Sequence, residues 1–251
     1  MVSAARYFPL RAAGFSSNPF RALTDAAWAD VAVLSAAISD LFDQTAAHLQ
    51  LFGALGAGKT TSLLGLQRRA QDHGLRTGYA YLAEGQHALT NEAGDVATLD
   101  LFLLDEAQRL AGRSWRRLLA KIAEPPGRDP SRQQPVRLVF SAHANQSARF
   151  AAAGLPLATV ELGALSLPEY RAILDRRIAT AALPGQPHAT LTDDAIAYLQ
   201  ATFGPNRRAA EWLLYEVFQR LRAPEVVSSA HLQALHDEPP PGRHDQPAPG
   251  R

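Results

Sequence analysis

The order of apolar and polar positions divides the chain into two parts. Up to about residue 165, short apolar runs alternate with amphipathic stretches, which predicts strands and helices of a parallel α/β sheet. The expected strands are HLQLFGAL, RTGYAYLAE, LDLFLLDE, VRLVFSAH and LATVEL. Two of them, LDLFLLDE and VRLVFSAH, are nearly continuous apolar runs, as is typical of parallel strands that are buried on both faces. We therefore expect a parallel sheet with helices on both faces.

Helical periodicity links these strands and then replaces them. One helix is expected from Thr24 to about residue 44, a second over TTSLLGLQRRAQDHG with Gly74 as its C-cap, and a third over SWRRLLAKIAE. After Ser166 only helical patterns follow, with Ser166 and Thr192 as N-caps, which predicts a small all-helical lid.

These patterns give four expected parts. They are an N-terminal arm (1–23), an α/β core (24–165), a helical lid (166–236) and a disordered, proline-rich tail (237–251). The stretch PPGRDPSRQQP is expected to form a flexible loop within the core.

Composition narrows the class of protein. The chain has 251 residues, 47% of them apolar, which is enough for a substantial core. A net charge of +1 excludes a globally basic nucleic-acid binder but leaves room for a local basic patch. No apolar run approaches the ~18 residues of a membrane span, so we expect a soluble, cytoplasmic protein. There is no cysteine, so thiolate metal sites are excluded.

A phosphate-binding motif stands between the first expected strand and the next helix. Gly53, Gly58, Lys59 and Thr60 fit the pattern G-x-x-x-x-G-K-[ST], and Gly56, Ala57 and Thr61 complete the expected loop. Backbone N–H groups and the helix N-terminus would surround phosphate oxygens. Lys59 would reach the β and γ phosphates, and the Thr60 hydroxyl would help to hold Mg²⁺. An ordinary glycine turn is the alternative, but the strand–loop–helix context argues against it.

The choice of lysine supports this interpretation. The chain contains 23 arginines and only two lysines, Lys59 and Lys121. A compact ammonium fits a loop wrapped around phosphate, whereas a planar guanidinium is wider.

Two acids follow the LFLL run. Asp105 would orient the hydration shell of Mg²⁺, and Glu106 would polarise an attacking water. An acidic helix cap after a buried strand is the alternative. The pair favours ATP hydrolysis over small-molecule phosphoryl transfer, and no N-K-x-D motif of the GTPase type is present.

Together these residues resemble the AAA+ branch of P-loop ATPases over roughly residues 24–235. The resemblance rests on GALGAGKTT, LLDE, the polar end of LVFSAH, RF before the fifth strand, and GPNRRA in the lid. It implies a sheet in which the phosphate-loop strand is central and one strand separates it from the acidic strand. It also implies a lid that closes over adenine, with ATP and Mg²⁺ as ligands.

The resemblance also implies roles for four polar side chains. Ser141 or His143 would sense the γ-phosphate, Arg149 in SARF would be an arginine finger that reaches a neighbouring subunit, and Arg207 would touch the γ-phosphate from the lid. Arg208 is the neighbour with which Arg207 could be confused. For His143 and Arg149, an ordinary surface position is the alternative.

The spacing points to a compact member of the family. Only 45 residues separate Lys59 from Asp105, which leaves little room for a full helix between the second and third strands. Together with the GFSSNPF arm and the small lid, this makes the chain look most similar to ExeA-like ATPases and to the helper ATPases of bacterial transposons.

The partner is indicated by residues 107–121. This segment has five cations and no acid: Arg109, Arg113, Arg116, Arg117 and Lys121. They could neutralise DNA phosphates, with Trp115 stacking on a base; alternatively they form a solvated helix face with Trp115 in the core. We therefore expect an oligomeric, DNA-associated ATPase that regulates or recruits a partner enzyme such as a transposase. The alternative is an ExeA-like switch that acts on a protein partner without DNA.

Overall fold

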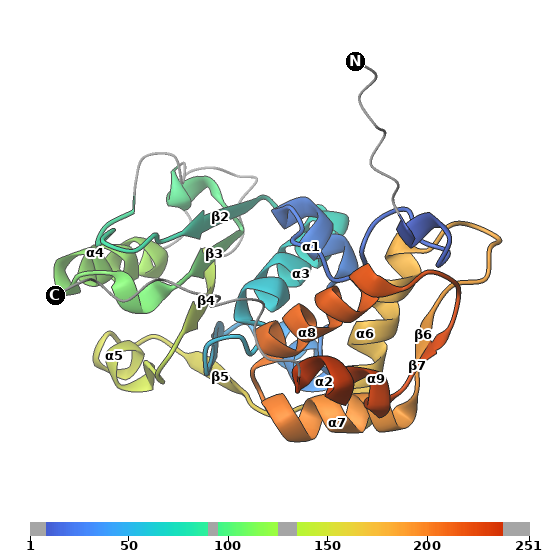
Figure 1. Cartoon of the computed structure of the whole chain (residues 1–251). Coiled ribbons are helices and arrows are strands. Elements are labelled where there is room, and N and C mark those ends of the chain that lie inside the picture. The colour runs from blue at the N-terminus through green and yellow to red at the C-terminus, as the bar shows by residue number, and fades with distance from the viewer. Residues whose placement is uncertain (1–8, 90–94, 125–134, 238–251) are drawn as a thin grey trace, which may run out of the picture.

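The computed structural model describes residues 9–89, 95–124 and 135–237 (Figure 1). The predicted flexible loop (125–135) and the predicted disordered tail (237–251) therefore lie outside the described residues, except for Pro135 and Asp237. None of the described helices is long and apolar enough to cross a membrane.

Five parallel strands form the main sheet. In the order in which they lie side by side they are β2 (Thr77–Tyr81), β3 (Leu101–Asp105), β4 (Arg137–Ala142), β1 (His48–Gly53) and β5 (Leu157–Leu162). β1 thus lies between two neighbours, and β4 alone separates it from β3, as the resemblance implies. The register places the carboxyl ends of β1, β3 and β4 at one edge of the sheet, where ligands of open α/β sheets bind.

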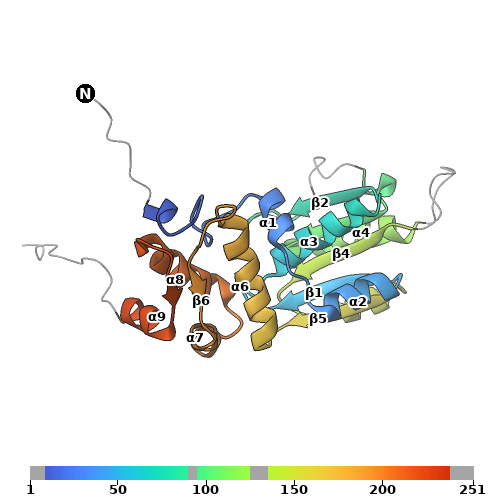
Figure 2. The same ribbon diagram turned by 90° about the vertical axis from the view of Figure 1, so that its right-hand side faces the viewer.

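Helices cover both faces of this sheet (Figure 2). On one face, α2 (Ala36–Gln44) and α3 (Lys59–Asp72) pack on a cluster that includes Leu101, Leu103 and Val139. On the other, α4 (Gly112–Ala123) and α5 (Ser147–Ala152) pack on Phe102 and Phe140. Alternate residues of a strand point to opposite faces, so the continuous apolar runs serve two cores at once.

The prediction of one continuous helix over 24–44 is wrong. The segment forms two helices, α1 (Asp25–Val31) and α2, with extended backbone at Ala32 between them. Each has its own N-cap: the Thr24 side chain accepts from the Ala27 N–H and that of Ser35 from the Ile38 N–H. The second cap was not recognised in the sequence because the apolar stripe runs on through it.

The lid consists of α6 (Leu167–Ala181), α7 (Asp193–Phe203), α8 (Arg207–Arg220) and α9 (Ser229–His236). The predicted N-caps hold, and Ser166 forms a reciprocal capping box with Glu169. The lid is not all-helical, however. Two short strands, β6 (Thr190–Leu191) and β7 (Val226–Val227), pair in parallel. Strands of two residues carry too little alternation to be predicted from sequence.

The N-terminal arm packs on the lid. Its buried residues Leu10, Phe15 and Phe20 belong to the same apolar cluster as α6, α7 and α8, and the Phe15 and Phe20 rings lie 5.7 and 5.0 Å from that of Phe218. At Gly14 the backbone has φ +88°, and a Cβ there would lie 2.1 Å from the carbonyl oxygen of Pro187. Only glycine allows this close approach of arm and lid.

Between β2 and β3 the described residues contain a short 3₁₀ helix, Val96–Thr98, and no α-helix. This agrees with the expectation drawn from the short spacing between Lys59 and Asp105.

Candidate active site

The glycine-rich loop joins β1 to α3 at the carboxyl edge of the sheet. α3 begins at Lys59, and its N-cap Gly58 has φ +86°, a left-handed conformation that favours glycine. A Cβ on Gly58 would lie 2.2 Å from Nη2 of Arg207, and one on Gly56 would lie 2.4 Å from Oδ1 of Asn206. The loop therefore packs closely against the start of α8, and a side chain at Gly56 or Gly58 would clash with the lid.

Lys59 is 5% exposed and turns back over the loop. Its Nζ donates to the carbonyl oxygens of Gly53 at 2.9 Å and Ala54 at 2.8 Å. Burial lowers the pKa of Lys59, and the nearby Glu106 and Asp105 carboxylates oppose this shift. The ammonium is thus placed at the cavity with part of its hydration already removed.

Asp105 is fully buried at the end of β3 and is the centre of a hydrogen-bond network. Thr60 Oγ1 donates to Asp105 Oδ2 at 2.7 Å, the Tyr79 hydroxyl lies 3.3 Å from the same oxygen, and Ser141 Oγ donates to Oδ1. Burial and the Asp105 carboxylate raise the pKa of Tyr79. The two side chains predicted to hold Mg²⁺, Thr60 and Asp105, are therefore in direct contact. Tyr79 was not singled out in the sequence, where it reads as one residue of an ordinary strand.

Glu106 has a strained backbone and a restrained side chain. Its φ of +58° makes it the only non-glycine residue in the described ranges with positive φ, a conformation that costs roughly 1–2 kcal/mol. Oε2 accepts from Gln108 Nε2 at 2.6 Å and lies 3.1 Å from Arg109 Nη2. Arg109 is itself fixed by the carbonyl oxygen of Leu82 at 2.6 Å. Glu106 thus lines the cavity while its Oε2 is held by Gln108 and Arg109.

Ser141 and His143 differ in where they point. Ser141 is completely buried; its hydroxyl donates to Asp105 and accepts the Glu106 N–H at 2.9 Å. His143 follows the end of β4, its side chain is 49% exposed, and its Nε2 lies 3.8 Å from Glu106 Oε2. Ser141 thus contacts Asp105 and the Glu106 backbone within the core, whereas His143 is partly exposed beside the Glu106 carboxylate.

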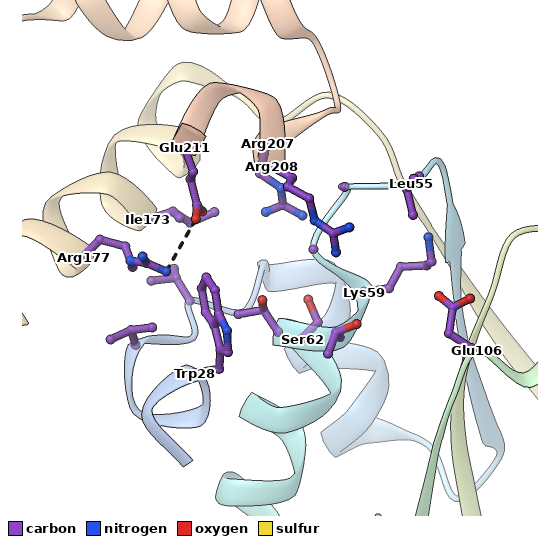
Figure 3. A pocket seen from close by; sticks show the side chains of 16 residues that line it. Trp28, Leu55, Lys59, Ser62, Glu106, Ile173, Arg177, Arg207, Arg208 and Glu211 are labelled. Atoms are coloured by element: carbon purple, nitrogen blue, oxygen red, sulfur yellow. Dashed lines mark ion pairs between the residues drawn. The ribbon is translucent and has the colours of Figure 1, made fainter. Parts of the chain in front are cut away.

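The lid and α1 complete the cavity, which has a volume of about 200 Å³. Figure 3 shows Arg207, Arg208 and Glu211 entering it from α8, opposite Lys59 and Glu106. Burial lowers the pKa of Arg207, and the Glu211 carboxylate counteracts that effect. The predicted lid arginine therefore faces the predicted phosphate loop in one cavity.

Several residues that line this cavity were missed in the sequence as site residues. Among them are Trp28 of α1, Arg177 of α6 and Glu211 of α8. Trp28 was recognised as part of an apolar stripe, but nothing in the local pattern shows that α6 and α8 converge on it. Only the tertiary structure brings the three together.

Arg149 does not line this cavity. It lies on α5, where its Nε donates to Gln146 Oε1 at 3.3 Å and its guanidinium carbon is 5.2 Å from the centre of the Trp115 ring. A role as an arginine finger would therefore have to be exerted on another subunit.

Four of the five cations of the basic segment lie on α4, whereas Arg109 precedes this helix and contacts Glu106 and Leu82. Arg113, Arg116 and Arg117 are exposed, and no ion pair engages them within the described part of the chain. Lys121 pairs with Asp95 at 2.5 Å. Trp115 is 1% exposed and packs edge-on against Phe140, with ring centres 5.5 Å apart. Stacking of Trp115 on DNA is therefore wrong, because its ring belongs to the core; the arginine face remains open.

Comparison with known proteins gives structural matches only. No model of a known protein family and no curated protein sequence matches the chain. Among solved structures, one variant of RuvB from Thermotoga maritima superposes with a TM-score of 0.56 at 18% identity, covering 80% of this chain and 65% of that one. A second RuvB variant superposes with a TM-score of 0.54 at 16% identity, and the match covers 88% of this chain and 73% of that one. The chain thus spans about 65% of the length of the first structures that it matches.

Proposed function

The chain has the AAA+ P-loop ATPase fold, and from this premise we propose that it binds ATP with Mg²⁺ and hydrolyses it. The observation that carries the proposal is the single cavity in which Lys59, Thr60 and Glu106 from the core face Arg207 from the lid. The cradle fits a polyphosphate, because its glycines carry no side chains of their own and its donors are cationic or backbone N–H groups.

Each residue has a definable task in this proposal. The loop and the N-terminus of α3 bind the phosphates, and Lys59 exchanges its loop carbonyl partners for phosphate oxygens. Thr60 and Asp105 would hold Mg²⁺, which when bound neutralises charge on the β and γ phosphates. Glu106 orients the attacking water and accepts its proton. Arg207 stabilises the charge of the terminal phosphate, and either Ser141, which contacts Asp105, or His143, which lies beside Glu106, would sense it.

The contacts of Glu106 bear on how it acts in hydrolysis. Gln108 and Arg109 both engage its Oε2, and they restrain the orientation in which the carboxylate can accept a proton. We propose that basal turnover is therefore slow and that binding of a partner releases Glu106.

We further propose that the protein acts as a homo-oligomer on DNA. Arg149 lies outside its own cavity and would complete the site of a neighbouring subunit. The exposed arginines of α4 would bind the DNA backbone. Recruitment or regulation of a partner enzyme such as a transposase is the role that we favour. An ATP-dependent switch that acts on a protein partner without DNA is the second candidate, and the engaged Glu106 is compatible with it.

The test combines two variants with a nucleotide-binding and a turnover assay. Lys59→Ala is expected to abolish ATP binding, whereas Glu106→Gln keeps binding and stops turnover; Glu124→Gln, an exposed acid at the end of α4, is the matched control. Equal loss of binding in both variants would contradict the roles assigned to them.

Turnover is then measured with and without duplex DNA. Stimulation by DNA that weakens with added salt supports the DNA role. Turnover that does not respond to DNA, with no salt-sensitive binding, would favour the protein-partner switch.

A further inference from the structure

The carboxylate of Asp105 is fully used as a hydrogen-bond acceptor by groups of the protein itself. Four donors from the described ranges engage it, two on each oxygen. Oδ2 accepts from Thr60 Oγ1 at 2.7 Å and from the Tyr79 hydroxyl at 3.3 Å. Oδ1 accepts from Ser141 Oγ and, at 3.0 Å, from the Glu106 N–H. Because a carboxylate has about four lone-pair sites, Asp105 has no acceptor site left for a further donor.

This arrangement conflicts with the role proposed for Asp105 at a Mg²⁺ ion. The hydroxyl of Thr60 and the carboxylate of Asp105 are oxygen ligands, which are the kind that Mg²⁺ takes. Mg²⁺ usually keeps several of its waters when it binds to a protein. These waters are donors, so an acid that orients them must have a free acceptor site. One of the four donors on Asp105 therefore has to leave when Mg²⁺ binds.

The four donors differ in how easily they can leave. Ser141 is completely buried, so a released hydroxyl there would find no water, and the Glu106 N–H belongs to the chain directly after Asp105 and cannot swing away. Thr60 need not leave, because a hydroxyl that donates its proton still has lone pairs for a metal ion. The contact of Tyr79 is the longest of the four, and its side chain is only partly buried. The Tyr79 hydroxyl is therefore the donor that leaves at the lowest cost.

The position of Tyr79 in the sheet explains how its hydroxyl reaches Asp105. In the described sheet, β2 is an edge strand that pairs only with β3, the strand that ends at Asp105. The Tyr79 ring packs against the apolar cluster that includes residues of α2 and α3. Phenylalanine at this position would keep that packing and would remove only the hydroxyl.

We propose that the Tyr79 hydroxyl and the hydration shell of Mg²⁺ compete for the same acceptor site on Asp105. Tyr79 is then a positioning residue that satisfies the buried carboxylate and weakens its hold on the metal ion. This inference rests on the proposed function, because it requires Mg²⁺ to bind at Thr60 and Asp105. Groups that hydrogen-bond a metal ligand usually have the opposite effect, since they orient the ligand and strengthen metal binding. The sign of the effect therefore decides the matter.

The experiment measures the affinity of the full chain for ADP by calorimetry, once with excess Mg²⁺ and once with a chelator. The ratio of the two dissociation constants reports how strongly the metal ion supports nucleotide binding. Tyr79→Phe is expected to increase this ratio by about three- to tenfold, the effect of one net hydrogen bond, while the affinity in chelator stays unchanged. The matched control is Tyr198→Phe, which removes from α7 a hydroxyl that lies 2.8 Å from His236 Nδ1 and outside the cavity. It is expected to keep the wild-type ratio.

The outcomes separate this inference from the proposed function. An unchanged ratio in Tyr79→Phe overturns the competition, and so does a lower ratio, which would show that Tyr79 orients Asp105 for the metal ion. Tyr79→Leu also lacks the hydroxyl and takes the place of Tyr79→Phe should that variant not fold. Wild-type ADP binding that is lost in Lys59→Ala but does not respond to Mg²⁺ overturns this inference and leaves the phosphate site standing. If the wild type binds no ADP under either condition, both proposals are overturned.

Discussion

The arginine face of α4 gives the sharpest quantitative prediction. We expect that replacing Arg113, Arg116 and Arg117 together by alanine removes DNA-backbone contacts while the fold is retained. All three side chains are exposed and lack ion pairs within the described residues, and alanine is the best helix former. The change in unfolding free energy should stay within about 0.5 kcal/mol per site.

The size of the effect follows from counterion release. Each phosphate neutralised contributes about 0.9 to the slope of log affinity against log salt concentration, so three contacts account for a slope of up to about 2.7. At about 0.1 M salt that corresponds to a loss of affinity of up to roughly 500-fold. The buried side of α4, with Trp115 at 1% exposure, is untouched by these substitutions.

Fluorescence anisotropy of a labelled duplex, titrated between about 50 and 200 mM salt, measures both quantities. A double variant, Arg11→Ala with Arg222→Ala, removes exposed arginines of the arm and of the segment after α8 and should leave the slope unchanged. If the triple variant kept the wild-type slope and affinity, α4 would not be the DNA-binding surface and the protein-partner switch would gain support.

Three further predictions concern assembly and stability. If Arg149 acts on a neighbouring subunit, mixing inactive Arg149→Ala with inactive Lys59→Ala should restore measurable ATP turnover, and no recovery would speak against action in trans. Trp115→Ala should lower the unfolding free energy by about 3–5 kcal/mol in denaturant titration, because the ring is buried between Phe140 and Phe150; a loss below 1 kcal/mol would contradict its core position. Burial and the Arg137 charge lower the pKa of His48 from 6.5 to about 4, so the fold favours the neutral imidazole. The stability that comes from neutral His48 is complete above pH 6.5 and is lost as the pH falls toward 4, which lowers the unfolding free energy by up to roughly 3 kcal/mol. A His48→Asn variant should flatten that part of the curve of stability against pH.

The elements that the sequence predicted well share one property: their signal is local. The glycines of the phosphate loop, the apolar run that ends in Asp105 and the cap at Ser166 each express their structure within a few residues. The break between α1 and α2 was missed because it depends on packing. Ala32 lies against Gly65 of α3, where a Cβ would be 2.7 Å from that of Ala32. An apolar stripe does not reveal such a close approach to a neighbouring helix.

The candidate site divides in the same way. Lys59, Thr60, Asp105 and Glu106 could be placed from motifs, and Arg207 from a family resemblance. The Glu211–Arg177 pair could not, because its two members lie on different helices. Electrostatic pairs between distant segments have no sequence period.

The contacts of Arg177 also connect the cavity to the N-terminal arm. Its Nε and Nη2 donate to carbonyl oxygens of the arm, its guanidinium lies over the ring of Trp28 of α1, and its Nη1 lies 3.5 Å from Glu211 Oε2. The arm is bonded to the lid through Gly14 and Asn18, whereas α1 packs on α3 of the core. Phe20 packs in the lid cluster, and Asp25 begins α1 on the core. The short segment between them therefore joins lid and core, as a second connection in addition to the one between β5 and α6. A movement of the lid relative to the core would therefore carry the described part of the arm with it.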